Sequence, residues 1–189
     1  MNPGDSRVWP ALDDGELGLV GHRSFDKVFD ATGSVTTQHQ YCVVLPSFEE
    51  SGNLPAGIHE ATWEELEARY GTTPHRQSLL AGLKRALDSL RDAGCRRAYV
   101  DGSFVTAKED PADFDVCWEE SNVDPLLLDP VLIDFSERRR PQKERFGGEL
   151  FPATMPAGPG YADFVDYFQR ERDTNAPKGI VAIDLKDLP

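Results

Sequence analysis

The sequence predicts an α/β (α+β) fold in which helices flank a small mixed sheet. Helix-type and strand-type patterns alternate along the chain from residue 62 onward, an order typical of such folds. The chain has 189 residues, of which 39% are hydrophobic and 10% aromatic, so it can form one core of ordinary size but not two deep ones. We interpret residues 1–53 as an N-terminal extension with a possible strand at residues 41–45, and residues 54–189 as the main domain.

Two helices are predicted from their start signals and apolar spacing. Thr62 and Glu65 fit a capping box, because each side chain can accept a hydrogen bond from the other's backbone amide, and this helix should end at Tyr70. Thr73-Pro74 places a capping residue before a proline at the first helical position. A longer helix should follow, because apolar residues recur at spacings of three and four: Leu79, Leu80, Leu83, Ala86, Leu87 and Leu90.

The rest of the chain contains short β-prone runs separated by loops and short helices. Residues 46–57 are rich in turn residues and should form an irregular connection. Asp124-Pro125 and Asp129-Pro130 each combine a capping residue with proline, which predicts one or two short helices there. Residues 164–168 have the apolar spacing of a helix. Strands are predicted at residues 98–100, 114–118, 149–151 and 180–185.

Charge and composition narrow the classes of partner. The net charge of −13 and the isoelectric point near 4.7 argue against binding of bulk nucleic acid, because the protein's field repels phosphate backbones. The three cysteines have neither the spacing of a zinc site nor that of a disulfide framework. No signal-peptide pattern and no long apolar segment occurs, so we expect a cytoplasmic protein with no membrane partner.

Two acidic residues are predicted to share one face of a strand. Successive side chains of a strand point to opposite faces, so Asp113, Asp115 and Cys117 should lie on one face and the alternate apolar residues on the other. Neighbouring carboxylates repel one another unless a cation or a strong donor lies between them. Mg²⁺ prefers such oxygen ligands, so this pair is a candidate metal site.

A small polar pair precedes these carboxylates along the chain. Gly102 permits a close backbone approach, and Ser103 places a hydroxyl donor beside it, a combination suited to holding a phosphate. Asp101 comes directly before this pair. Two roles are open for it: a further metal ligand, or a residue that orients the phosphate loop. Taken alone, Gly102-Ser103 is also compatible with an ordinary turn at the end of a strand.

Together these residues resemble the signature of minimal nucleotidyltransferases of the DNA polymerase β superfamily. The signature is a Gly-Ser pair, nine intervening residues, and then an acidic pair alternating with apolar residues, here residues 102–116. The chain is also similar, over a wider range, to an uncharacterised bacterial family of nucleotidyltransferase-like proteins. That likeness rests on residues 54–62, 101–106, 147–152, 168–170 and 177–180.

The resemblance implies the nucleotidyltransferase fold and transfer of a nucleoside monophosphate from a nucleoside triphosphate (NTP). Asp113 and Asp115 would hold magnesium, with two ions present when NTP is bound, and Ser103 would contact the outgoing phosphates. The acceptor would be a protein, a small molecule or an RNA end. Members usually add a third carboxylate from a neighbouring strand; Glu149 and Asp134 are the two candidates. We favour Glu149 as catalytic, because the Asp-Pro pairs make the region of Asp134 look helical.

Other interpretations of the same residues stay open at this point. The two carboxylates also fit the solvated face of an edge strand, a common pattern in antiparallel sheets. Lys178, before a strand, can contact a phosphate or simply be exposed. A basic cluster can guide a triphosphate or form a solvated helical face: Arg138, Arg139, Arg140, Lys143 and Arg145. The alternative function is a catalytically inactive nucleotide-binding or protein-interaction module, for example a partner in a toxin-antitoxin or defence pair.

Overall fold

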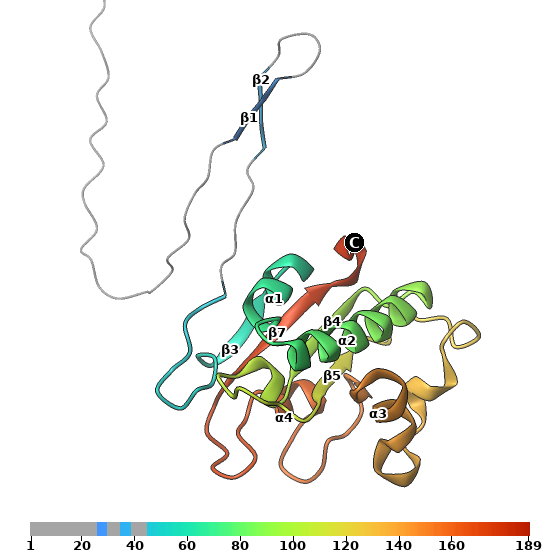
Figure 1. Ribbon diagram of the computed structural model, residues 1–189. Helices are drawn as coiled ribbons and strands as arrows, with labels where there is room; N and C mark the ends of the chain where they lie inside the picture. The colour runs from blue at the N-terminus through green and yellow to red at the C-terminus, as the bar shows by residue number, and fades with distance from the viewer. Residues whose placement is uncertain (1–25, 30–34, 39–44) are drawn as a thin grey trace, which may run out of the picture. The chain divides into compact units, whose positions relative to one another are not determined.

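A computed structural model describes residues 26–29, 35–38 and 45–189 (Figure 1). The chain divides into two compact units, Met1–Cys42 and Val43–Pro189. In the first unit, β1 (Asp26–Phe29) and β2 (Val35–Gln38) pair as an antiparallel ribbon. Most of the strand predicted at residues 41–45 lies outside the described residues, and Leu45 itself has no regular secondary structure.

A five-stranded mixed sheet forms the centre of the second unit, in the order β3-β7-β4-β5-β6. Strand β4 is antiparallel to β5 and to β7, whereas β3 is parallel to β7 and β6 is parallel to β5. The predicted small mixed sheet flanked by helices is therefore confirmed. The strands are β3 (Gly57–Glu60), β4 (Arg97–Asp101), β5 (Phe114–Trp118), β6 (Gly148–Pro152) and β7 (Gly179–Asp184).

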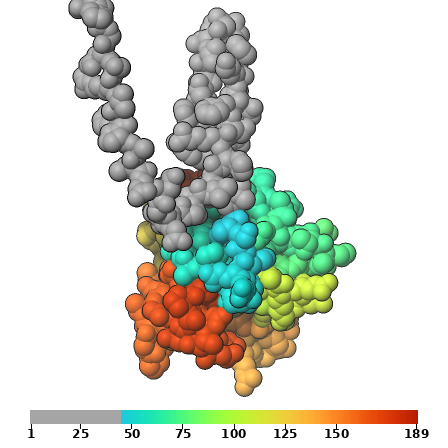
Figure 2. Space-filling view, turned by 90° about the vertical axis from the view of Figure 1, so that its left-hand side faces the viewer, coloured from blue at the N-terminus to red at the C-terminus, as the bar shows by residue number. Residues whose placement is uncertain are grey.

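Strand β3 is the strand of the second unit that the sequence patterns did not predict, and β1 and β2 of the first unit were not predicted either. Strand β3 begins at the last residue of the stretch expected to be irregular and forms one edge of the sheet, where only four residues pair with β7. Its apolar residue Ile58 is 41% exposed, so the strand has no buried apolar run that sequence patterns can detect. Figure 2 shows this part of the chain (cyan) beside the C-terminal region (orange to red), where the Gly179 amide donates to the Leu54 carbonyl at 3.0 Å.

Both predicted helices are present, and they cover one face of the sheet (Figure 1). Helix α1 (Trp63–Tyr70) begins with the capping box, in which the Glu65 amide donates to the Thr62 hydroxyl at 3.2 Å and the Thr62 amide to the Glu65 carboxylate at 2.9 Å. Helix α2 (Pro74–Asp92) is capped by Thr73. Its leucines are buried against the sheet, which explains why their spacing was a reliable signal.

The two faces of the sheet carry separate apolar clusters. Phe114, Val116 and Trp118 of β5 belong to the cluster beneath α1 and α2. Cys117 belongs to the cluster on the opposite face, together with helix α4 (Phe164–Phe168), and is a buried space-filler. The predicted alternation of β5 is therefore confirmed. Because β5 lies between β4 and β6, the interpretation of its carboxylates as the face of an edge strand is wrong.

Short helices and turns connect β5 to β6. Asp124-Pro125 starts a turn and no helix, a correction explained by the 93% exposure of Leu126, which leaves no apolar face to bury. Asp129 does cap a short 3-10 helix, Pro130–Ile133. Helix α3 (Arg140–Phe146) follows a second one, Ser136–Arg139. Further 3-10 turns are Ser103–Val105 after β4 and Leu185–Asp187 after β7.

No helix in the described part of the chain is both long and apolar enough to span a membrane.

Candidate active site

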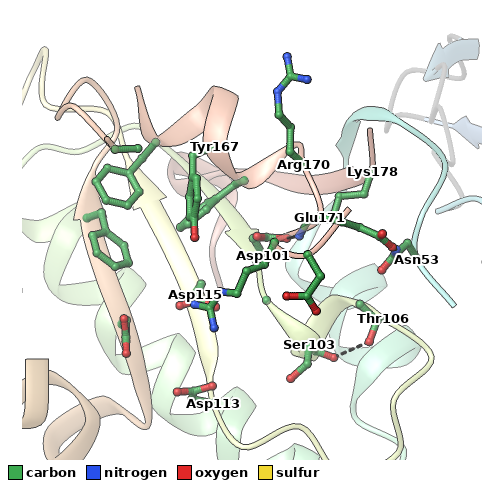
Figure 3. A pocket seen from close by; sticks show the side chains of 18 of the residues that line it. Asn53, Asp101, Ser103, Thr106, Asp113, Asp115, Tyr167, Arg170, Glu171 and Lys178 are labelled. Carbon is green, nitrogen blue, oxygen red and sulfur yellow. Dashed lines mark hydrogen bonds and ion pairs between the residues drawn. The ribbon is translucent and has the colours of Figure 1, made fainter. Parts of the chain in front are cut away.

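A cleft of about 820 Å³ opens where β4, β5 and β6 present acidic side chains (Figure 3). The 3-10 turn after β4, helix α4 and the segment between α4 and β7 complete its walls. Asn53 joins this last wall by donating a hydrogen bond to Glu171. The cleft contains all five residues that the sequence assigned to catalysis, metal binding or phosphate binding: Gly102, Ser103, Asp113, Asp115 and Glu149.

Three carboxylates stand in a row across neighbouring strands. Asp115 pairs in register with Asp101 on one side and with Glu149 on the other, and register partners present their side chains on the same face. Asp113 lies two residues before Asp115 and therefore also faces the cleft. Asp134 is partly exposed, does not line the cleft, and caps its own turn by accepting from the Ser136 amide at 2.9 Å. The structure thus brings Glu149, and not Asp134, to the predicted pair.

The carboxylate of Asp115 is the least compensated group in this row. Burial, followed by the charges of Asp101, Asp113 and Glu149, raises its pKa to about 7. Within the described part of the chain it has no ion pair and no side-chain hydrogen bond. Burial also raises the pKa of Asp101, although the paired ammonium of Lys178 opposes that effect. A cation bound beside Asp115 would relieve the repulsion that raises its pKa.

Lys143 of α3 and Arg139, just before α3, form ion pairs with Asp113 and Glu149. Lys143 Nζ lies 2.8 Å from Asp113 Oδ2 and 2.6 Å from Glu149 Oε1, and these hydrogen bonds raise the pKa of Lys143. Arg139 Nε lies 2.5 Å from Glu149 Oε2. The basic cluster is therefore divided, since Arg140 and Arg145 instead pair with acidic residues outside the cleft.

Of the two interpretations of Lys178, simple exposure is wrong. Its side chain is only 12% exposed and pairs with Asp101 in the cleft. The physical reason is the position of β7 next to β4, which places the residue before β7 close to the last residue of β4. Strand order is a long-range property, so the local sequence around Lys178 contained no signal for this pair.

Gly102 lets the turn after β4 approach the acidic row closely. Its φ is +82°, and a Cβ at this position would lie 2.5 Å from Asp115 Oδ2, so only glycine fits. Ser103 follows at the start of the 3-10 turn and lines the cleft. No other described residue hydrogen-bonds its hydroxyl, whereas its carbonyl accepts from Thr106 Oγ1 at 2.8 Å (Figure 3). The hydroxyl is thus free to donate to a ligand.

Arg76 of α2 holds this turn by hydrogen bonds to its backbone, a role that the sequence analysis did not predict. Its side chain is 3% exposed and donates to five backbone carbonyls at 2.7 to 3.3 Å. The available signal was its position on the apolar stripe of α2, where a charged residue requires internal partners. The acceptors are the carbonyls of Tyr70, Phe104, Thr106, Lys108 and Glu109.

The donor set fits a hard divalent cation, although the described residues contain no preformed metal site. Among the described residues, no three His, Cys, Asp or Glu side chains are already grouped to hold a metal ion. Lysine and arginine side chains neutralise Asp101, Asp113 and Glu149 instead. Asp115, which is largely buried and has no ion pair among the described residues, could supply, next to Asp113, an oxygen ligand of the kind that a magnesium ion prefers.

Comparison with known proteins identifies the family of this chain. The pattern of a family of unknown function (DUF6932) matches residues 46–184, which include every residue of the acidic row. No curated protein and no solved structure matches the chain. The match covers most of the chain, and the protein therefore belongs to the family of unknown function DUF6932.

Proposed function

We propose that this protein is a magnesium-dependent nucleotidyltransferase that moves a nucleoside monophosphate from an NTP to a protein, a small molecule or an RNA end. The observation that carries the proposal is the in-register row Asp101, Asp115 and Glu149, with Asp113 on the same side and Gly102-Ser103 at its edge. The cleft of about 820 Å³ has the size of a small-molecule site. The negative net charge makes bulk nucleic acid the weakest acceptor.

Each group at the site has a role in this proposal. Asp113 and Asp115 would hold magnesium, which, when bound, neutralises charge on the phosphates. The free hydroxyl of Ser103 donates to the departing phosphates, and Gly102 keeps the backbone near enough for that contact. Glu149 shares the metal or accepts the proton of the attacking hydroxyl once its basic partners have moved.

The bonds of the proposed reaction balance without a covalent protein intermediate. A hydroxyl oxygen of the acceptor forms a bond to the α-phosphorus, and the bond from that phosphorus to the bridging oxygen breaks. Pyrophosphate leaves with the electron pair, and the hydroxyl proton passes to a carboxylate of the cleft. Positioning and charge neutralisation are the main demands of this chemistry, and the acidic row and the Gly-Ser turn supply both kinds of group.

A second function is favoured by one specific observation. Lys143 places an ammonium between Asp113 and Glu149, where a catalytic cation is otherwise needed. In an inactive nucleotide-binding or protein-interaction module, such as a partner in a toxin-antitoxin or defence pair, these ion pairs would be permanent. The two functions therefore differ in whether the ion pairs of Lys143 open when nucleotide arrives.

Labelled nucleotides distinguish the two functions. The purified protein is incubated with Mg²⁺ and with α-labelled or γ-labelled NTPs, with and without cell lysate, beside the Asp113→Asn/Asp115→Asn variant. Nucleotidyl transfer predicts that the α-label reaches an acceptor and that the double variant abolishes the transfer. Transfer of the γ-label alone would make the protein a phosphotransferase, and nucleotide binding without transfer would favour the inactive module.

A further inference from the structure

We infer that Lys143 and Arg139 form an ion-pair latch that keeps Asp113 and Glu149 neutralised until a polyphosphate binds both basic groups. The ligand of this cleft is then a divalent cation together with a polyphosphate, and each promotes binding of the other. The inference rests on the proposed function for the chemical class of these ligands. It adds a role for two basic residues that the nucleotidyltransferase resemblance does not assign.

Lys143 closes the latch from helix α3. Its ammonium contacts one oxygen of Asp113 and one of Glu149, at 2.8 and 2.6 Å, so it bridges the side chains that flank Asp115. A metal ion that arrives alone must break both ion pairs and leave the ammonium without a partner. Binding of metal alone is therefore opposed by the protein's own cation.

Arg139 reinforces the latch from a strained segment. Glu137, Arg138 and Arg139 all have left-handed backbone conformations, with φ of 48°, 58° and 61°, which are costly for residues other than glycine. The guanidinium of Arg139 pairs with Glu149 and lies 4.9 Å from the ring centroid of Phe151. These contacts hold the strained segment in place, and a ligand that takes over the guanidinium would release Glu149.

Charge complementarity indicates which ligand opens the latch. A polyphosphate alone would draw Lys143 and Arg139 away from Asp113 and Glu149 and meet the repulsion of these carboxylates, and a metal alone would meet the ammonium of Lys143. Bound together, the metal takes the carboxylates, and the phosphates take the lysine and arginine, which bind phosphate strongly. Both sets of charges are then paired, so each ligand increases the affinity for the other.

Substitution of Lys143 by methionine tests the latch without any turnover. Wild type, Lys143→Met and Arg140→Met are titrated with Mn²⁺ alone, with free Mn²⁺ counted by electron paramagnetic resonance, and separately with inorganic triphosphate in EDTA. Arg140→Met is the matched control, because it removes one positive charge from the same helix but from a side chain that pairs with Glu137 and Glu144. Circular dichroism verifies that each variant folds. We expect Lys143→Met to fold, because the Lys143 side chain is 41% exposed and its replacement leaves no buried cavity.

The latch predicts that Lys143→Met binds Mn²⁺ about tenfold or more tightly than both other proteins, and inorganic triphosphate more weakly. Arg139→Met should shift both affinities in the same directions. Equal Mn²⁺ affinity in Lys143→Met and Arg140→Met, or no Mn²⁺ binding at all, would overturn the inference. The predicted shifts without nucleotide transfer would refute the proposed function alone, whereas transfer with equal Mn²⁺ affinities would refute the latch alone.

Discussion

Replacing Asp115 with asparagine should stabilise the folded protein, and the gain should depend on pH. Burial and the neighbouring carboxylates raise the pKa of Asp115 from an ordinary 3.8 to about 7. Between these two values the unfolded chain ionises this carboxyl while the folded protein still binds its proton. The stabilising contribution of Asp115 is therefore fully present below about pH 4 and is lost as the pH rises through 7.

The magnitude follows from the linkage between proton binding and folding. One pKa unit corresponds to about 1.36 kcal/mol, so ionisation of Asp115 costs the folded state about 4 kcal/mol at pH 8. Asparagine has nearly the same shape and no charge to desolvate. We expect Asp115→Asn to raise the free energy of unfolding by up to about 4 kcal/mol at pH 8, and to change it little at pH 4.

Urea unfolding at pH 8 and pH 4 measures this difference. Other groups titrate over the same range in both proteins, so the quantity compared is the difference between variant and wild type at each pH. Asp92→Asn is the control, because the Asp92 side chain is 72% exposed and the change should have little effect at either pH. An Asp115→Asn variant that is less stable than wild type at pH 8, or equally changed at both pH values, would refute the reasoning.

Three further substitutions test the framework that holds the site. Arg76→Met should lower the free energy of unfolding by about 3 kcal/mol or more, because it leaves buried carbonyls without donors, and a loss below about 1 kcal/mol in urea would contradict this. Gly82→Ala should lower the free energy of unfolding by about 1–3 kcal/mol, because a Cβ would lie 1.7 Å from the Phe146 carbonyl oxygen. This loss should outweigh the better helix propensity of alanine, and an unchanged melting temperature would argue against this packing. Arg138→Gly should stabilise the protein by about 1 kcal/mol by relieving a left-handed conformation, and a lower melting temperature would show that no such strain exists.

Local patterns predicted the elements that bury a regular apolar face. The capping box of α1, the leucine stripe of α2 and the alternation of β5 each depend on residues a few positions apart, and all three are confirmed. Strand β3 has no such face, because it is short, lies at an edge and leaves Ile58 exposed. The Asp124-Pro125 pair shows the opposite error, since a capping residue forms a helix only where apolar residues behind it are buried.

The site was predictable as far as its groups follow one another along the chain. The resemblance to the nucleotidyltransferase signature implied one site for Gly102, Ser103, Asp113 and Asp115, and all four line the cleft. The ion pairs of these carboxylates join strands and helices distant in sequence, so the local pattern around Lys143 could not reveal that it bridges two of them. Strand order determines which carboxylate lies beside Asp115, because β6 is adjacent to β5 and pairs Glu149 with Asp115.

Transfer of the α-phosphate label from an NTP, compared between wild type and Asp113→Asn/Asp115→Asn, tests the central claim most directly. The account predicts a labelled acceptor and released pyrophosphate with wild type in the presence of Mg²⁺, and neither with the folded double variant. Nucleotide binding without α-label transfer, in lysate as well as in buffer, would contradict the claim and identify the cleft as a binding site without turnover.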